Sequence, residues 1–89
     1  MNHDEAEGIA IAALGFLAER PEHLGRFLAE SGIGPETLRV AATDPGFLAG
    51  ILDFLMNDES LLLEFTENRR LRPLMVAAAH HRLSGPHPE

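Results

Sequence analysis

Five histidines are the side chains of this sequence best suited to binding a metal. They are His3, His23, His80, His81 and His87. Two histidines bind one metal from a helix when they are three or four residues apart, because this spacing places them on one face. His80 and His81 are adjacent, so they point about 100° apart. We interpret them as surface side chains near a helix C-terminus, where a cation is favoured, and expect no metal and no cofactor.

The acidic and nucleophilic residues form no catalytic pattern. Glu64 and Glu67 are three residues apart and precede Arg69 and Arg70. General acid–base catalysis needs carboxyl groups in a desolvated cleft with shifted pKa values. This segment instead favours a solvated helix face with local ion pairs. The serines lack a glycine-flanked nucleophile elbow, and the sequence contains no cysteine. We therefore expect that the protein is not an enzyme.

The only basic cluster is Arg69-Arg70-Leu71-Arg72. It follows two predicted helices joined at Asn57-Asp58, an order also found in helix-turn-helix DNA readers. The second helix, however, begins with acidic residues, and no lysine or aromatic side chain accompanies the arginines. The net charge of −7 also repels nucleic acids and anionic lipids. Nucleic-acid binding through Arg69, Arg70 and Arg72 is the alternative function, and we expect instead that these arginines complement a helix C-terminus and nearby acids.

Size and composition predict one soluble domain. The chain has 89 residues, within the range of a single domain. Its first five residues carry two acidic side chains and no lysine or arginine, where a secretory signal is positively charged. The longest apolar run, residues 9–14, is far shorter than the ~20 residues that cross a bilayer. Together with the absence of cysteine, these features predict a cytoplasmic protein that does not enter a membrane.

Prolines and capping residues divide the chain into short helices. Asp4 is expected to cap a helix over about 5–19, and Asp58 a helix over 59–68. Further helices are predicted to start at Pro21, Pro35, Pro45 and Pro73, because proline suits the first helical position. The second of these six helices is expected to stop at Gly32 and the fourth to end near Met56. The sixth is expected to bury Leu74, Met75, Ala78 and Ala79.

No segment shows the period-two alternation of a strand, and Val, Ile and Thr are scarce. We predict an all-α fold, a compact orthogonal bundle of five or six short helices with the first and fourth as its scaffold. Residues 1–83 are expected to form the domain and residues 84–89 a mobile tail.

The fourth and fifth predicted helices are apolar on nearly all sides. Leu61-Leu62-Leu63 followed by Phe65 covers most of one helix, and residues 47–56 do the same in the other. One interpretation places both helices centrally beneath the first and sixth. The other leaves Phe54, Met56, Leu62 and Leu63 as an exposed patch for a partner helix or a second copy.

We favour a function built on that patch. An apolar groove between the fourth and fifth helices, with Arg69, Arg70 and Arg72 at its rim, predicts a non-enzymatic protein–protein interaction module or regulatory adaptor. Its partner is expected to be an unidentified protein or a second copy of the chain.

Several stretches together resemble a bacterial family found mainly in alphaproteobacteria, domain of unknown function number 3572. They are Phe16-Leu17-Ala18, Leu24-Gly25-Arg26-Phe27-Leu28, Pro45-Gly46-Phe47-Leu48, Ile51-Leu52-Asp53-Phe54-Leu55 and Asp58-Glu59-Ser60-Leu61-Leu62. The resemblance covers about three-quarters of the chain and is not found after Asn68. It implies a compact helical cytoplasmic protein without an assigned activity, so no functional residue is carried over from it.

Overall fold

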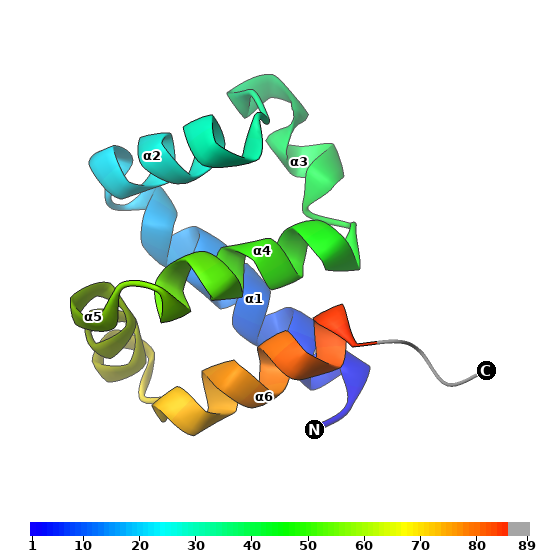
Figure 1. Cartoon of the computed structure of the whole chain (residues 1–89), viewed down its shortest axis with the longest axis vertical. Coiled ribbons are helices and arrows are strands. Elements are labelled where there is room, and N and C mark those ends of the chain that lie inside the picture. Colours follow the sequence, from blue (N-terminus) through cyan, green and yellow to red (C-terminus); the bar gives the residue numbers. More distant parts are fainter. Residues whose placement is uncertain (86–89) are drawn as a thin grey trace.

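The helix boundaries follow from local capping chemistry. The computed structural model describes residues 1–85. Its elements are α1 (His3–Ala18), α2 (Pro21–Ser31), a 3-10 turn η1 (Pro35–Thr37), α3 (Leu38–Ala41), α4 (Pro45–Met56), α5 (Glu59–Arg69) and α6 (Pro73–Ser84). The described residues contain no strand. The predicted all-α helical bundle is therefore confirmed (Figure 1).

Proline begins α2, α4 and α6, as predicted. Asp44 Oδ1 accepts a hydrogen bond of 3.0 Å from the Gly46 backbone N–H at the start of α4. Asp58 Oδ1 accepts one of 3.2 Å from the Leu61 N–H at the start of α5. Gly32 ends α2 with φ 76°, a left-handed conformation that glycine adopts without a Cβ clash. These features confirm the predicted boundaries of α2, α4 and α5 to within one residue.

The cap of α1 differs from the prediction. Asn2, not Asp4, is the N-cap: its Oδ1 accepts from the Glu5 N–H at 2.7 Å, and Glu5 Oε1 accepts from the Asn2 N–H at 3.0 Å. This reciprocal pair is a capping box, which satisfies two otherwise free backbone donors. The helix consequently begins at His3, and Asp4 lies within its first turn.

Three helices, α1, α4 and α6, pack against one another and enclose the core. Helix α4 is central, because seven of its twelve residues are buried. Helix α1 buries small side chains, among them Ala6, Ala10 and Ala13, which allow close approach of a neighbouring helix. In Figure 1, α4 crosses in front of α1, and α6 lies beside both. The scaffold expected of the first and fourth helices is thus completed by the sixth.

Helix α6 uses a different face from the one predicted. Its buried residues are Val76, Ala79 and Leu83, whereas Leu74 and Met75 are exposed. Val76, Ala79 and Leu83 also recur at helical spacing, so the sequence offers two overlapping stripes. The alanine-rich side of α1 accepts the narrower stripe, which leaves Leu74 and Met75 outside the core.

Phenylalanine pairs attach α5 and α2 to this core. The Phe16 and Phe65 rings of α1 and α5 meet edge to face with centroids 5.3 Å apart. Phe27 of α2 lies between Phe47 and Phe54 of α4, at centroid distances of 5.5 and 5.3 Å. Such aromatic pairs add about 0.5–1.5 kcal/mol each beyond the area they bury. Helix α5 is peripheral, so the interpretation that placed it centrally with α4 is wrong for α5.

Among residues 1–85, no helix is long and apolar enough to cross a membrane. Helix α6 ends at Ser84, and residues 86–89 of the predicted tail lie outside the described part of the chain.

Candidate protein-binding groove

Phe54, predicted to be part of an exposed patch, lies in the core. Its side chain is 8% exposed. Phe27 contacts one edge of its ring, and the Arg26 guanidinium lies 4.8 Å from the ring centroid. Helix α2 therefore covers the face of α4 that was expected to be open.

The depression beside Phe54 is charged, not apolar. Its volume is about 490 Å³, and it is lined by Arg26, Glu30, Phe54, Asn57, Asp58, Glu59 and Ser60. Arg26 Nη2 lies 3.4 Å from Asp58 Oδ2, and Arg26 Nε lies 3.9 Å from Glu30 Oε2. The apolar groove expected between α4 and α5 is thus replaced by a polar one that joins α2 to both helices.

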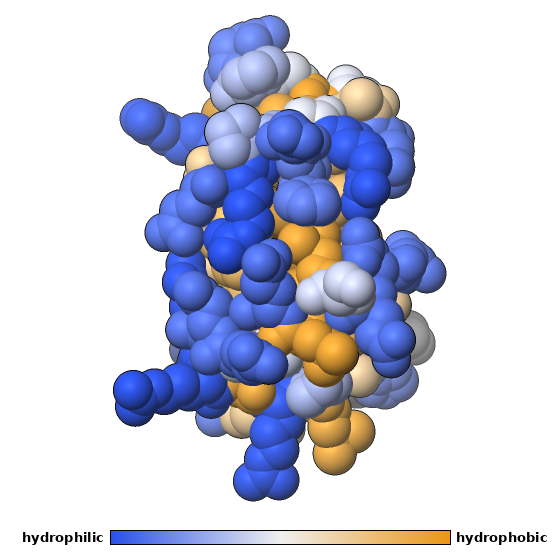
Figure 2. Space-filling model, turned by 90° about the vertical axis from the view of Figure 1, so that its left-hand side faces the viewer, coloured by the Kyte–Doolittle hydropathy of each residue, from blue (hydrophilic) through white to orange (hydrophobic). Residues whose placement is uncertain are grey.

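The other three apolar residues of the predicted patch divide between core and surface. Met56 and Leu62 are half-buried and pack against the core. Leu63 is 45% exposed. Figure 2 looks at the side formed by α5 and the adjoining ends of α2 and α6, where apolar surface runs between hydrophilic side chains. Leu63 is the exposed large apolar residue that α5 contributes to the described surface.

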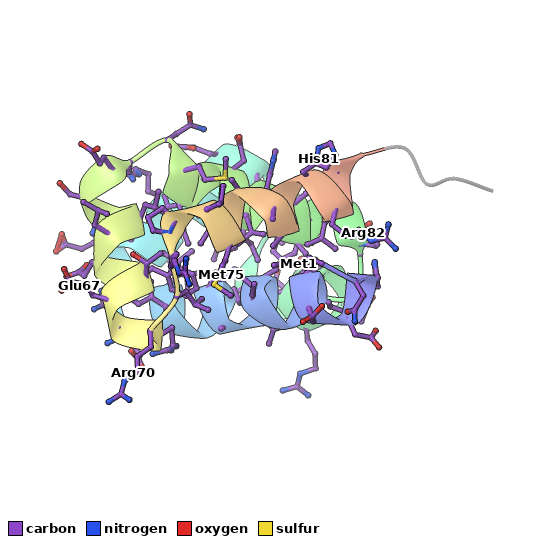
Figure 3. The ribbon with its side chains drawn as sticks, turned by 90° about the horizontal axis from the view of Figure 1, so that it is seen from below. Met1, Glu67, Arg70, Met75, His81 and Arg82 are labelled. Atoms are coloured by element: carbon purple, nitrogen blue, oxygen red, sulfur yellow. The ribbon has the colours of Figure 1, made fainter. Side chains whose placement is uncertain are left out.

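The three arginines of the basic cluster point in different directions. Arg69 is half-buried: its Nη1 donates to Asn68 Oδ1, and its Nη2 lies 3.8 Å from where a Cβ on Gly15 would be. Arg70 ends α5 with φ 56° and points away from the molecule (Figure 3). Arg72 is the exposed N-cap residue of α6. Of these three arginines, Arg69 is therefore the one that lies against another helix, α1.

The expected ion pairs between these arginines and neighbouring acids do not form. Glu64 Oε1 of α5 instead accepts from Nε of Arg20, in the linker between α1 and α2, at 3.2 Å. Within the described residues, no carboxylate lies within 4.0 Å of Arg69, Arg70 or Arg72. The arginines at the end of α5 thus face the partial negative charge of the helix C-terminus and no carboxylate partner among the described residues.

An apolar groove does exist, but between α1 and α6. We call it the α1/α6 groove; its volume is about 390 Å³, and it is lined by Met1, Glu5, Gly8, Ile9, Ala12, Arg69, Leu71 and Met75. Figure 3 shows Met1 and Met75 between the two antiparallel helices. Met1 is 47% and Met75 39% exposed. Two charged residues and six apolar or small ones therefore line an open surface.

Sequence reasoning placed only Arg69 of this set in a binding site. Met75 and Ile9 were assigned to apolar helix faces, and Met1 and Leu71 were not assigned to a site. Gly8 and Ala12 lie four residues apart and so share one face of α1. Nothing outside α1 lies within 4 Å of the position of a Cβ on Gly8. This pair of small residues was the sequence feature that could have indicated the groove, because small side chains leave space for another chain to approach.

Charge is strongly segregated along the chain. Residues 68–85 contain four arginines and no acidic residue, a net charge of +4. Residues 1–67 contain 13 acidic residues and three arginines, a net charge of −10. Figure 3 shows Arg82 near the C-terminal end of α6 and Arg70 at the end of α5, far from Arg82. The positive charge is therefore concentrated in the last part of the described chain, from the end of α5 through α6, and residues 1–67 carry a net negative charge.

Among the described titratable groups, the carboxyl group of Asp58 has a shifted pKa. The Leu61 N–H bond holds the pKa of Asp58 below its ordinary value of 3.8, and the Arg26 guanidinium acts in the same direction. His80 Nε2 lies 3.9 Å from Asp53 Oδ1 of α4. Within residues 1–85, no three histidine or acidic side chains gather as metal ligands would. The lowered pKa of Asp58 is therefore explained by its role as the N-cap of α5.

Comparison with known proteins gives one match. The pattern of the family described as "Protein of unknown function (DUF3572)" matches residues 3–86. The match extends through α6, so the resemblance does not stop at Asn68 as the sequence reading had it. No curated protein and no solved structure matches the chain.

Proposed function

The chain belongs to the DUF3572 family of proteins of unknown function, and we propose that it is a non-enzymatic protein-binding domain or adaptor. It binds an apolar segment of another polypeptide in the α1/α6 groove. A cytoplasmic location is part of the proposal, and the absence of cysteine from the sequence supports it.

The exposed methionines of the groove carry this proposal. Met1 and Met75 are exposed and, together with Ile9 and Leu71, line the groove, whose volume is about 390 Å³. Contiguous exposed apolar surface on a small domain is typical of a protein–protein contact. Methionine is unbranched and flexible, so it adapts to the side chains of a partner. A helix laid between α1 and α6 would cover all four side chains.

The charged residues of the groove support binding in preference to catalysis. Glu5 is engaged in the capping box through Oε1, and Arg69 lies over Gly15. Catalytic pairs of acid and base are held within hydrogen-bonding reach of each other or of a common substrate atom. Glu5 lies in the first turn of α1, whereas the Arg69 guanidinium lies beside Gly15, ten residues further along that helix. The two charges therefore suit recognition of two separate charges on a partner.

A photo-crosslinking experiment tests the proposed function. A photoreactive residue replaces Met75 in one variant and Val40 in the control, and both are irradiated in extracts of the source cells. Val40 is also exposed, at 75%, but lies on α3. We expect adducts with a second polypeptide from position 75 and none from position 40. Equal labelling at the two positions, or none at either, would contradict the proposal.

The charge of α6 favours one other function. The net charge of +4 on residues 68–85, with Arg70 and Arg72 exposed, is the kind of surface that contacts nucleic-acid phosphates. A filter-binding assay at low salt with short duplex DNA and RNA tests this alternative. Binding that is lost when Arg69, Arg70 and Arg72 become alanine would support it. Absent or unchanged binding would remove these residues from consideration.

A further inference from the structure

We propose that the polypeptide bound in the α1/α6 groove is a second copy of this chain, related to the first by a two-fold axis. In this arrangement Glu5 of each copy faces Arg69 of the other. The inference rests on the proposed function of the groove and adds to it the identity of the partner.

The positions of Glu5 and Arg69 carry the argument. Both line the groove, and the Arg69 guanidinium lies beside Gly15. Gly15 follows Glu5 by ten residues, which corresponds to about 15 Å along α1. The groove therefore has an acid at one end and a base at the other. A two-fold axis across its middle exchanges the ends, so both charges meet opposite charges in the partner.

The surface between these two charges is suited to close approach. Gly8 and Ala12 lack long side chains, and the space above Gly8 is open. Met75 of the same copy stands beside this space (Figure 3). A two-fold contact places protruding methionines of one copy against the low glycine and alanine surface of the other. A self-complementary surface of this kind is what an isologous dimer requires.

Charge segregation makes self-association compatible with the net charge of −7. The same contact brings the end of the groove that holds Arg69, together with residues 68–72 and their net charge of +3, toward the first turns of α1 in the partner. Those turns carry Asp4, Glu5 and Glu7. The remaining acids of each copy lie on other elements or further along α1. The contact is thus attractive locally, although the two whole chains repel.

The interface is expected to be small. A stable complex buries about 600–800 Å² per partner at the low end of the usual range. That area is at most about one-seventh of the 5481 Å² exposed by this chain. Two short helices supply a face near this lower limit, so we expect a reversible dimer with a Kd in the micromolar range.

Sedimentation equilibrium of the full chain, over a roughly 100-fold range of concentration that spans micromolar values, tests the dimer. We expect Glu5→Arg and Arg69→Glu each to raise the Kd about tenfold, because each brings two pairs of like charges together. The double variant E5R/R69E restores opposite pairs and is expected to return to within about threefold of wild type. Thermal unfolding of every variant confirms that it is folded.

Two controls separate the interface from the stability of α1. Glu5→Gln keeps the capping box, since glutamine also serves at this position, and is expected to weaken the dimer less than Glu5→Arg. Glu22→Arg makes the same charge change in the first turn of α2 and is expected to leave the Kd unchanged. Met75→Asp should abolish the dimer, while Val40→Asp should not.

The outcomes distinguish this inference from the proposed function. A chain that stays monomeric throughout, or a double variant no better than the single variants, overturns the dimer. If position 75 then still crosslinks to a different polypeptide, the groove is a protein-binding site for another partner. A dimer that survives Met75→Asp overturns the assignment of the interface to this groove.

Discussion

The guanidinium carbon of Arg26 lies 4.8 Å from the centroid of the Phe54 ring, and Arg26 Nη2 lies 3.4 Å from Asp58 Oδ2. One cation on α2 therefore covers an aromatic ring of α4 and contacts the capping residue of α5. The Phe54 ring faces this cation on one side and Phe27 on another. Phe54, which the sequence predicted as part of a binding patch, thus stabilises the fold.

Replacing Phe54 with alanine is expected to destabilise the domain strongly. The change removes a buried ring and its contact with Phe27, and such substitutions cost about 3–5 kcal/mol. Small domains have about 5 kcal/mol of stability in total, so much of the population should unfold. Urea denaturation followed by circular dichroism measures the loss. Arg26→Ala, which removes only the exposed cation, should cost about 1 kcal/mol or less; equal losses would contradict this assignment.

Two leucines on adjacent helices test the assignment of core and surface. Leu52 of α4 is fully buried, whereas Leu63 of α5 is 45% exposed. Leu52→Ala leaves a cavity and should cost about 2–5 kcal/mol. Leu63→Ala should change the free energy of unfolding by only about 0.5 kcal/mol. The same urea denaturation experiment measures both, and a cost below about 1 kcal/mol for Leu52→Ala would mean that the packing of α4 is misassigned.

Asp58 should make the stability dependent on acidic pH. Its pKa in the folded protein lies below the ordinary value of 3.8, chiefly because the carboxylate accepts the Leu61 N–H. The unfolded chain then binds more protons in this range, so the stabilisation is present above pH 3.8 and is lost as the pH falls through the folded pKa. Asparagine also caps helices but does not titrate. Wild type should lose more stability than Asp58→Asn in this window; parallel curves would exclude the effect.

Arg70 holds a backbone conformation that favours glycine. It ends α5 with φ 56°, while the Leu71 N–H donates to the Thr66 carbonyl at 2.8 Å. The left-handed conformation costs a residue with a Cβ about 1–2 kcal/mol. Arg70→Gly should therefore stabilise the domain by about 1 kcal/mol and raise the Tm by about 4–8 °C. Arg69→Gly, one residue earlier within the helix, should instead lower the Tm.

The helix boundaries were predictable because local chemistry sets them. Pro45 after Asp44 and the Asp58 cap needed no knowledge of the rest of the chain. The cap of α1 was missed because Asn2, Asp4 and Glu5 all suit a helix start, and only the reciprocal bonds of Asn2 with Glu5 decide between them. Local sequence signals thus predict that a helix exists and approximately where it ends. Where several neighbouring residues could act as the N-cap, they do not determine which one does.

The candidate site was not predictable in the same way. Arg26 is 28 residues from Phe54 in the sequence, and no local pattern predicts that the guanidinium of Arg26 contacts the Phe54 ring. The α1/α6 groove arises because Val76 of α6, not Met75, faces the core formed with α1 and α4. Both residues belong to plausible apolar stripes, so only the packing of distant helices leaves Met75 outside.

The packing of α6 against α1 has a consequence for synthesis of the chain. The ribosome finishes Ala18 at the end of α1 about 66 residues before Ser84 at the end of α6. At about 5–20 residues per second this interval lasts roughly 3–13 s. During that time the face of α1 that α6 covers stays without this neighbour. The nascent chain therefore completes its core late, and this interval is when a chaperone would contact it.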